Sequence, residues 1–107
     1  MSSDIKVVQP SGILDGIRGN QLRRDISDVV ASGANSVLID LQDVTFMDSS
    51  GLSSLISAQR IVRTAGGKLF LCSISDQAQM LFELTKMNRV FEIFADREEF
   101  NSKIEAS

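Results

Sequence analysis

The feature that most constrains the fold is the segment of residues 36–52, which passes from an apolar run into a periodic helix. Residues 37–41 (Val-Leu-Ile-Asp-Leu) are a short, mainly apolar run between polar residues, which is typical of a strand buried on both faces of a parallel sheet. Asp48, Ser49 and Ser50 follow, and each of these side chains can cap a helix N-terminus. The segment therefore predicts a strand, a tight loop and a helix start that presents two hydroxyl groups beside a carboxylate.

Predicted strands and helices alternate along the chain. The apolar periodicity predicts strands at residues 5–8, 12–15, 37–41, 68–72 and 90–94, and helices that follow a loop at residues 15–20, cover about residues 50–65, and begin near Asp76 and Asp96. Such alternation implies right-handed crossovers and parallel pairing. We therefore expect an α/β fold in one domain over residues 1–107, with a core of about residues 5–104 and a mixed, mainly parallel sheet of four to five strands flanked by about four helices.

The composition places the chain in an ordinary class. Its 107 residues suffice for one hydrophobic core, and 43% hydrophobic with 23% charged residues is typical of a soluble globular protein. No apolar run reaches the roughly 20 residues that span a bilayer, and the first residues lack the basic and apolar segments of a secretory signal. Cys72 is the single cysteine, which excludes an internal disulfide. We therefore expect a cytoplasmic protein without a membrane partner.

Charge and missing residue types exclude several functions. A net charge of −3 argues against nucleic acid binding, which needs a basic face to neutralise phosphates. The sequence contains no histidine, which excludes a Ser–His or Cys–His nucleophilic site. One cysteine without histidine also cannot supply the four ligands of a structural zinc site. We expect no cofactor, although composition alone leaves open a hard-metal site or a carboxylate that acts as a base.

Ser49 and Ser50 have two possible interpretations. In the first, the tripeptide Asp48-Ser49-Ser50 only caps a helix, which contributes about 1 kcal/mol. In the second, one hydroxyl is exposed and is phosphorylated. A phosphate at a helix N-terminus meets unpaired N–H groups and the positive end of the helix dipole, so the helix would tolerate the modification. The added charge of about −1.5 to −2, next to Asp48, would act on whatever docks at this edge.

Four aspartates suggest a function of a different class. In this alternative the chain is a receiver-like domain that binds magnesium and accepts phosphate on an aspartate. These residues are Asp15, Asp40, Asp43 and Asp48. The alternative is that Asp15 and Asp43 are turn residues that bind their own backbone. A phosphoryl-accepting site would also bring a lysine from a late strand end, whereas Lys86 and Lys103 are expected on helices.

Two further residues, Gly51 and Cys72, have a structural interpretation, and Gly51 has a functional one as well. Gly51 is either a loop residue that needs no Cβ, or a position where a partner's backbone or a phosphate approaches closely. Cys72 lies in an apolar strand and is expected in the core, because buried thiols behave as small hydrophobes.

With these residues in view, the sequence resembles the STAS domain family, specifically the stand-alone bacterial anti-sigma factor antagonists. The matching segments are residues 12–15 (Gly-Ile-Leu-Asp), residues 37–41, residues 44–52 (Val-Thr-Phe-Met-Asp-Ser-Ser-Gly-Leu) and residues 66–69 (Gly-Gly-Lys-Leu). The resemblance covers about nine-tenths of the chain and implies a sheet flanked by helices. It also implies a regulator of transcription that catalyses nothing.

The resemblance further implies a mechanism and its partners. The unphosphorylated protein would bind an anti-sigma factor with serine-kinase activity and so free the sigma factor. The kinase would phosphorylate the serine after the motif aspartate, which is Ser49, and a PP2C-type phosphatase would reverse this step. The docking surface would be formed by Asp15, Asp48, Ser50, Gly51 and Leu52. The alternative within the same fold is a non-switching subunit of a stressosome-like or transporter-associated complex.

The sequence departs from the family pattern at two places. Only residues 5–9 are available for the strand that usually precedes residues 12–15, so the N-terminal hairpin is shortened or absent. The first helix of the family usually begins with a Ser or Thr cap near the position of Arg18. Here Arg18 is followed by Gly19 and Asn20, which makes Asn20 the candidate cap.

Overall fold

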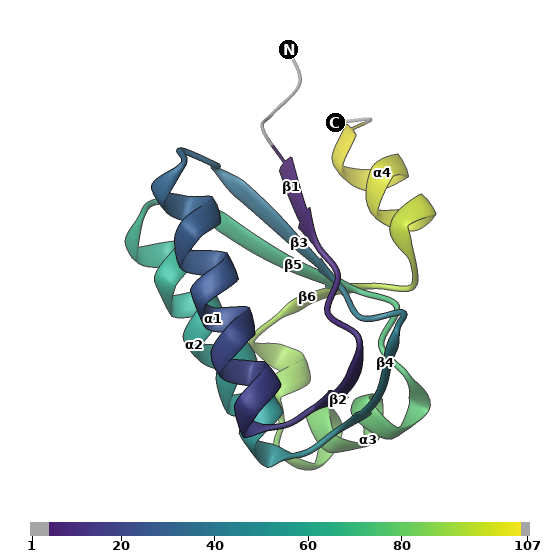
Figure 1. The fold of residues 1–107 in the computed structure, drawn as a ribbon. Coiled ribbons are helices and arrows are strands. Elements are labelled where there is room, and N and C mark those ends of the chain that lie inside the picture. The colour runs from purple at the N-terminus through teal and green to yellow at the C-terminus, as the bar shows by residue number, and fades with distance from the viewer. Residues whose placement is uncertain (1–4, 106–107) are drawn as a thin grey trace.

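The computed structural model describes residues 5–105, which form alternating strands and helices (Figure 1). In chain order the elements are β1 (Ile5–Val8), β2 (Gly12–Leu14), α1 (Gly16–Ala31), β3 (Ser36–Asp40), β4 (Val44–Met47), α2 (Ser49–Thr64), β5 (Lys68–Cys72), α3 (Asp76–Leu84), η1 (Met87–Arg89), β6 (Glu92–Phe94) and α4 (Arg97–Glu105). The predicted α/β fold with four α-helices is confirmed. Within residues 5–105, no helix combines the length and apolar character required to cross a membrane.

The described strands form two parallel sheets rather than one. The main sheet has the strand order β1-β3-β5-β6, and β2 pairs with β4 in a separate two-stranded sheet that extends past its end (Figure 1). Because β1 and β2 belong to different sheets, they do not form a hairpin with each other.

The prediction of a loop before α2 is wrong, because residues 44–47 form strand β4. Its residues are buried, exposed, exposed and buried in turn, so neither alternation nor a continuous apolar run marks the strand.

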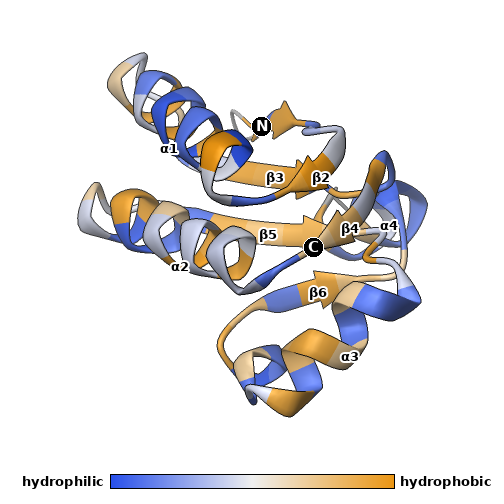
Figure 2. Cartoon of the chain, turned by 60° about the horizontal axis from the view of Figure 1, so that its bottom comes forward, coloured by the Kyte–Doolittle hydropathy of each residue, from blue (hydrophilic) through white to orange (hydrophobic). Residues whose placement is uncertain are grey.

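The main sheet is covered on both faces. Along β3, Val37 and Ile39 face the larger core under α1 and α2, whereas Leu38 faces a smaller cluster under α4. Figure 2 shows β3 and β5 as largely hydrophobic ribbons beside helices with mixed surfaces. The smaller cluster consists of Leu38, Phe70, Cys72 and Phe100. The prediction of strands buried on both faces is thus confirmed, and it explains why β3 and β5 carry apolar side chains at consecutive positions.

Cys72 belongs to the smaller cluster and is fully buried. Burial is the main cause that raises the pKa of its thiol from 9.0 to about 11, because the low-dielectric surroundings disfavour the thiolate. The expectation that this cysteine belongs to the core is confirmed.

Helix α1 begins earlier than the sequence suggested. Residues 16–20 are helical, and the cap is Asp15, whose side chain accepts a hydrogen bond from the Arg18 backbone N–H at 3.0 Å. The loop at residues 15–20 and the cap at Asn20 were therefore wrong predictions. Gly19 has a packing role instead of a loop role, because a Cβ there would lie 2.0 Å from the Ser54 hydroxyl oxygen. The glycine lets α1 and α2 pack closely.

Candidate functional site

Two strand–helix junctions lie side by side at one end of the molecule. Leu14 and Met47 are the paired last residues of β2 and β4, and an aspartate follows each of them. Asp15 caps α1 and Asp48 caps α2, in each case by accepting a backbone N–H from three residues further along. The Asp48 backbone N–H also donates to the Leu14 carbonyl oxygen at 3.3 Å. The structure therefore places the N-termini of both helices, and both predicted aspartates, at a common edge.

Ser49 and Ser50 are the first two residues of α2, and both are exposed. The Asp48 carboxylate caps the helix through a 2.9 Å hydrogen bond from the Gly51 backbone N–H, so neither serine hydroxyl is needed for this task. The predicted helix cap within residues 48–50 is thus present, and it is supplied by Asp48 rather than by either serine. The first N–H groups of a helix have no acceptor within it, and together with the dipole they favour an anion at this place.

Gly51 and Leu52 lie beneath this surface. A Cβ at Gly51 would lie 2.1 Å from the Leu14 carbonyl oxygen, so the missing side chain lets α2 rest against the end of β2. Leu52 is only 4% exposed and packs in the core. Both residues were predicted to contact a partner, but their burial gives them the role of fixing the first turn of α2.

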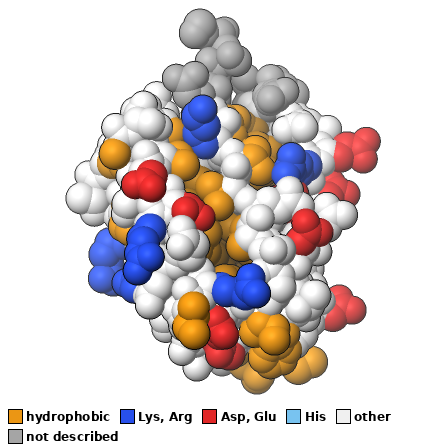
Figure 3. Space-filling model, viewed as in Figure 1, with side chains coloured by type: hydrophobic (Ala, Val, Ile, Leu, Met, Phe, Trp, Pro, Cys, Tyr) orange, Lys and Arg blue, Asp and Glu red, His pale blue; other side chains and the backbone are white. Residues whose placement is uncertain are grey.

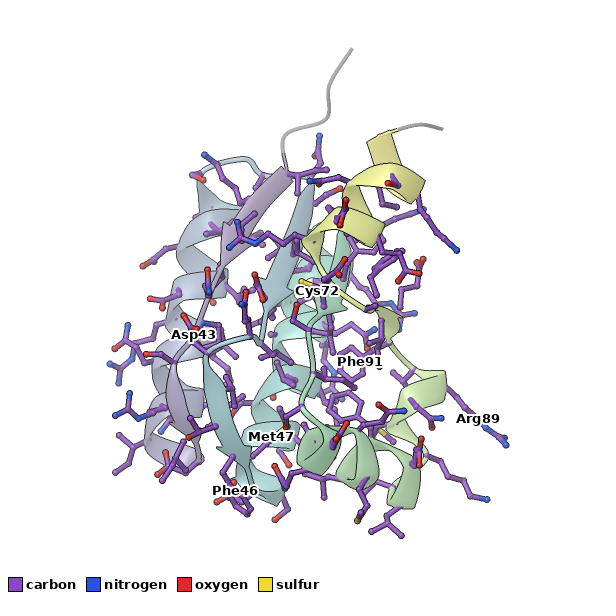
Figure 4. The ribbon with its side chains drawn as sticks, turned by 90° about the vertical axis from the view of Figure 1, so that its right-hand side faces the viewer. Asp43, Phe46, Met47, Cys72, Arg89 and Phe91 are labelled. Carbon is purple, nitrogen blue, oxygen red and sulfur yellow. The ribbon has the colours of Figure 1, made fainter. Side chains whose placement is uncertain are left out.

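Exposed apolar side chains lie near the two helix starts. Ile13 and Phe46 are paired across β2 and β4 and are 50% and 46% exposed, while their neighbours Leu14 and Met47 point inward. Ile17, in the first turn of α1, is 81% exposed. Figure 4 shows Phe46 at the end of the molecule where α2 begins. The sequence analysis missed these residues, because only the pairing of β2 with β4 shows that Ile13 and Phe46 face outward together.

Gln77 of α3 holds the residue that precedes the Asp48 cap. Its side-chain amide accepts the Met47 backbone N–H at 2.9 Å and donates to the Met47 carbonyl oxygen at 2.8 Å. The Gln77 side chain thus makes the two backbone hydrogen bonds that a further neighbouring strand would make at the edge of β4. This contact joins residues 30 positions apart, and nothing in the local sequence predicts it. It fixes the position of the following Asp48 and Ser49.

Asp40 and Asp43 lie at the other end of β4. Asp40 is 1% exposed, and its carboxylate contacts the Arg97 guanidinium at 2.6 Å. Asp43 accepts a hydrogen bond from Gln9, whose side-chain oxygen in turn accepts one from Arg97. The four aspartates are therefore split into two separate pairs. No group of three side chains suited to a metal ion occurs in residues 5–105.

A family model identifies the family of this chain, and solved structures share its fold. A family model described as the STAS domain matches residues 2–100. An anti-sigma-B factor antagonist of Bacillus subtilis is 31% identical, over 90% of this chain and 86% of that protein. Two solved structures share the fold. A putative anti-sigma factor antagonist of Thermotoga maritima has a TM-score of 0.86 with 20% identity, over 98% of this chain and 91% of that one. The Bacillus cell fate determinant SpoIIAA, in its phosphorylated form, has a TM-score of 0.69 with 20% identity, over 94% and 92% of the two chains.

Proposed function

The chain belongs to the STAS domain family, and on this premise we propose that it is a phosphorylation-switched anti-sigma factor antagonist. Its unphosphorylated form binds an anti-sigma factor that has serine-kinase activity, and this binding releases the sigma factor. Phosphorylation of Ser49 blocks the binding, and a PP2C-type phosphatase restores it. The names of the relatives support the general role, since they describe antagonists of anti-sigma factors.

The observation that carries this proposal is the position of Ser49. Its side chain is exposed at the first residue of α2, directly after the aspartate that caps the helix. A kinase can reach this hydroxyl without unfolding the chain. The cap remains in place after modification, because Asp48 supplies it.

The surroundings of Ser49 explain how a phosphate would act. The exposed side chains of Ile13, Ile17 and Phe46 offer apolar surface to a partner. A phosphate of about −1.5 to −2 charges at the same edge would have to lose its water on docking, which is costly without a matching cation. Modification therefore weakens docking while the helix itself tolerates it.

The receiver-like alternative has less support. The buried Asp40, which a phosphoryl-accepting site at the sheet edge would use, is occupied by the Arg97 guanidinium. Asp15 and Asp48 cap helices through their side chains. These contacts favour a binding role for the chain over a phosphoryl-accepting one.

Substitution of the two adjacent serines tests the acceptor. We expect Ser49→Ala to abolish phosphorylation by the cognate anti-sigma factor kinase, because it removes the acceptor hydroxyl. Ser50→Ala is the matched control, since Ser50 is also exposed in the first turn of α2, and it should still gain one phosphate. Intact-mass spectrometry of both variants and the parent, after incubation with the kinase and ATP, measures the modification. Phosphorylation of Ser49→Ala at the parent's rate, with none on Ser50→Ala, would move the acceptor to Ser50.

A further inference from the structure

The surface formed by α1 and α2 has a charge opposite to that of the whole chain. The two helices together contain five arginines and two aspartates, and α2 contains no acidic residue. Their net charge is therefore +3, in a chain whose net charge is −3. Figure 3 shows basic side chains on the flank where α1 lies. This concentration of positive charge is not used by the switch at Ser49.

The positive charge lines a groove between the two helices. A cavity of about 670 Å³ is lined by Arg23, Arg24 and Arg60, with Asp28 as its single acidic residue. The three arginines are exposed. Among residues 5–105 the one salt bridge is formed by Arg97, so none of these three guanidinium groups is paired with a carboxylate. The groove thus offers unpaired cations to an anionic partner.

The groove continues to the candidate functional site. A second cavity of about 470 Å³ reaches from Asp15 and Ser50 along the same helices. The two cavities share three lining residues, which are Asn20, Arg23 and Ser57. From Ser50 to Arg60 the helix rises about 15 Å, which matches four or five residues of an extended chain. One end of the groove lies beside the phosphorylation site and the other end lies among the arginines.

We propose that this groove, called here the α1–α2 groove, binds an acidic, extended segment of the anti-sigma factor. The inference rests on the proposed function and adds the chemistry of the partner's contact. Exposed arginines spread along two helices suit several carboxylates in a row better than one enclosed small anion. A phosphate on Ser49 would stand at the entrance of the groove and repel the acidic segment. The switch then acts by charge repulsion as well as by desolvation.

Neutralising two arginines tests the proposal. The double variant Arg24→Gln/Arg60→Gln should weaken binding of the unphosphorylated protein to its anti-sigma factor about fivefold to tenfold at low salt, with less effect at high salt. The matched control is Arg89→Gln, because Arg89 is exposed and points away from the groove (Figure 4). It should change the affinity less than twofold. Calorimetric titration at two salt concentrations measures both. Equal affinity of the double variant and the control would overturn the proposal.

A second titration separates this inference from the proposed function. If the unmodified chain binds no anti-sigma factor, the proposed function fails. A titration with a synthetic peptide of alternating Glu and Ser then tests separately whether the α1–α2 groove binds an acidic segment. We expect this peptide to shift the backbone amide NMR signals of Ser27, Ser57 and Arg60, and the double variant to lose these shifts. The absence of shifts, or equal shifts with inorganic phosphate at the same charge concentration, would overturn the assignment to an acidic segment.

Discussion

Replacement of Arg97 by methionine is expected to lower the free energy of unfolding by about 3 kcal/mol, since it leaves a buried carboxylate without its cation. The carboxylate is that of Asp40, which is 1% exposed and lies 2.6 Å from the Arg97 Nε. Its second oxygen accepts the Gln42 backbone N–H at 3.0 Å, a neutral contact that does not compensate a full charge. The expected loss of stability lies at the lower end of the range for breaking a buried ion pair, because the Arg97 side chain is itself 45% exposed.

Urea denaturation followed by circular dichroism measures this loss. Arg89→Met serves as the control, because it removes an exposed arginine without a salt bridge among the described residues and should change stability by less than about 0.5 kcal/mol. The double variant Asp40→Asn/Arg97→Met should recover much of the loss, since it removes the unpaired charge. Equal stability of Arg97→Met and Arg89→Met would show that the Asp40–Arg97 ion pair does not stabilise the fold.

Gly51→Ala is expected to destabilise the protein by about 2 kcal/mol, because the new methyl group would overlap the backbone of β2. The added Cβ would lie 2.1 Å from the Leu14 carbonyl oxygen and 2.9 Å from the carbonyl carbon. These are backbone atoms, which cannot rotate away, so the first turn of α2 must shift. Alanine's better helix propensity, about 1 kcal/mol, offsets part of the cost. The shift would also displace Ser49, so phosphorylation should slow in the same variant.

Gly16→Ala is the matched control for this substitution. Gly16 begins α1 beside Ser50, and an added Cβ there would meet the Ser50 Cβ at 3.8 Å, an ordinary contact. We expect its melting temperature to equal or exceed that of the parent. Thermal unfolding of both variants by far-UV circular dichroism measures the difference. Equal melting temperatures for the two variants would show that Gly51 has no special packing role.

Much of the fold could be predicted because the main sheet depends on local pattern. The run at residues 37–41 and strand β5, Lys68–Cys72, are apolar on both faces, and such a pattern distinguishes them from the amphipathic helices between them. Strand β4 could not be predicted in the same way. It pairs with only three residues of β2, through a ladder with a register shift, so long-range pairing rather than local pattern makes it a strand.

The candidate site was predictable only where its determinants are neighbours in sequence. Asp48 and Ser49 stand together in the chain, so the carboxylate and the hydroxyl at the start of α2 could be recognised. The outward pairing of Ile13 with Phe46 depends on a contact between distant strands. The α1–α2 groove depends likewise on the packing of two helices, which brings Arg23 and Arg60 to a single cavity. Surfaces formed between elements are therefore the part that the sequence does not reveal.

The central claim is that phosphorylation of Ser49 controls binding to an anti-sigma factor. The most direct measurement is calorimetric titration of the anti-sigma factor with the unmodified chain and with the chain phosphorylated at Ser49, under identical salt conditions. We predict at least about a 100-fold loss of affinity on phosphorylation, with an unchanged far-UV circular dichroism spectrum, because the phosphate adds charge at the docking edge without unfolding α2. Equal affinity of the two forms would contradict the account and leave the start of α2 as a structural helix terminus.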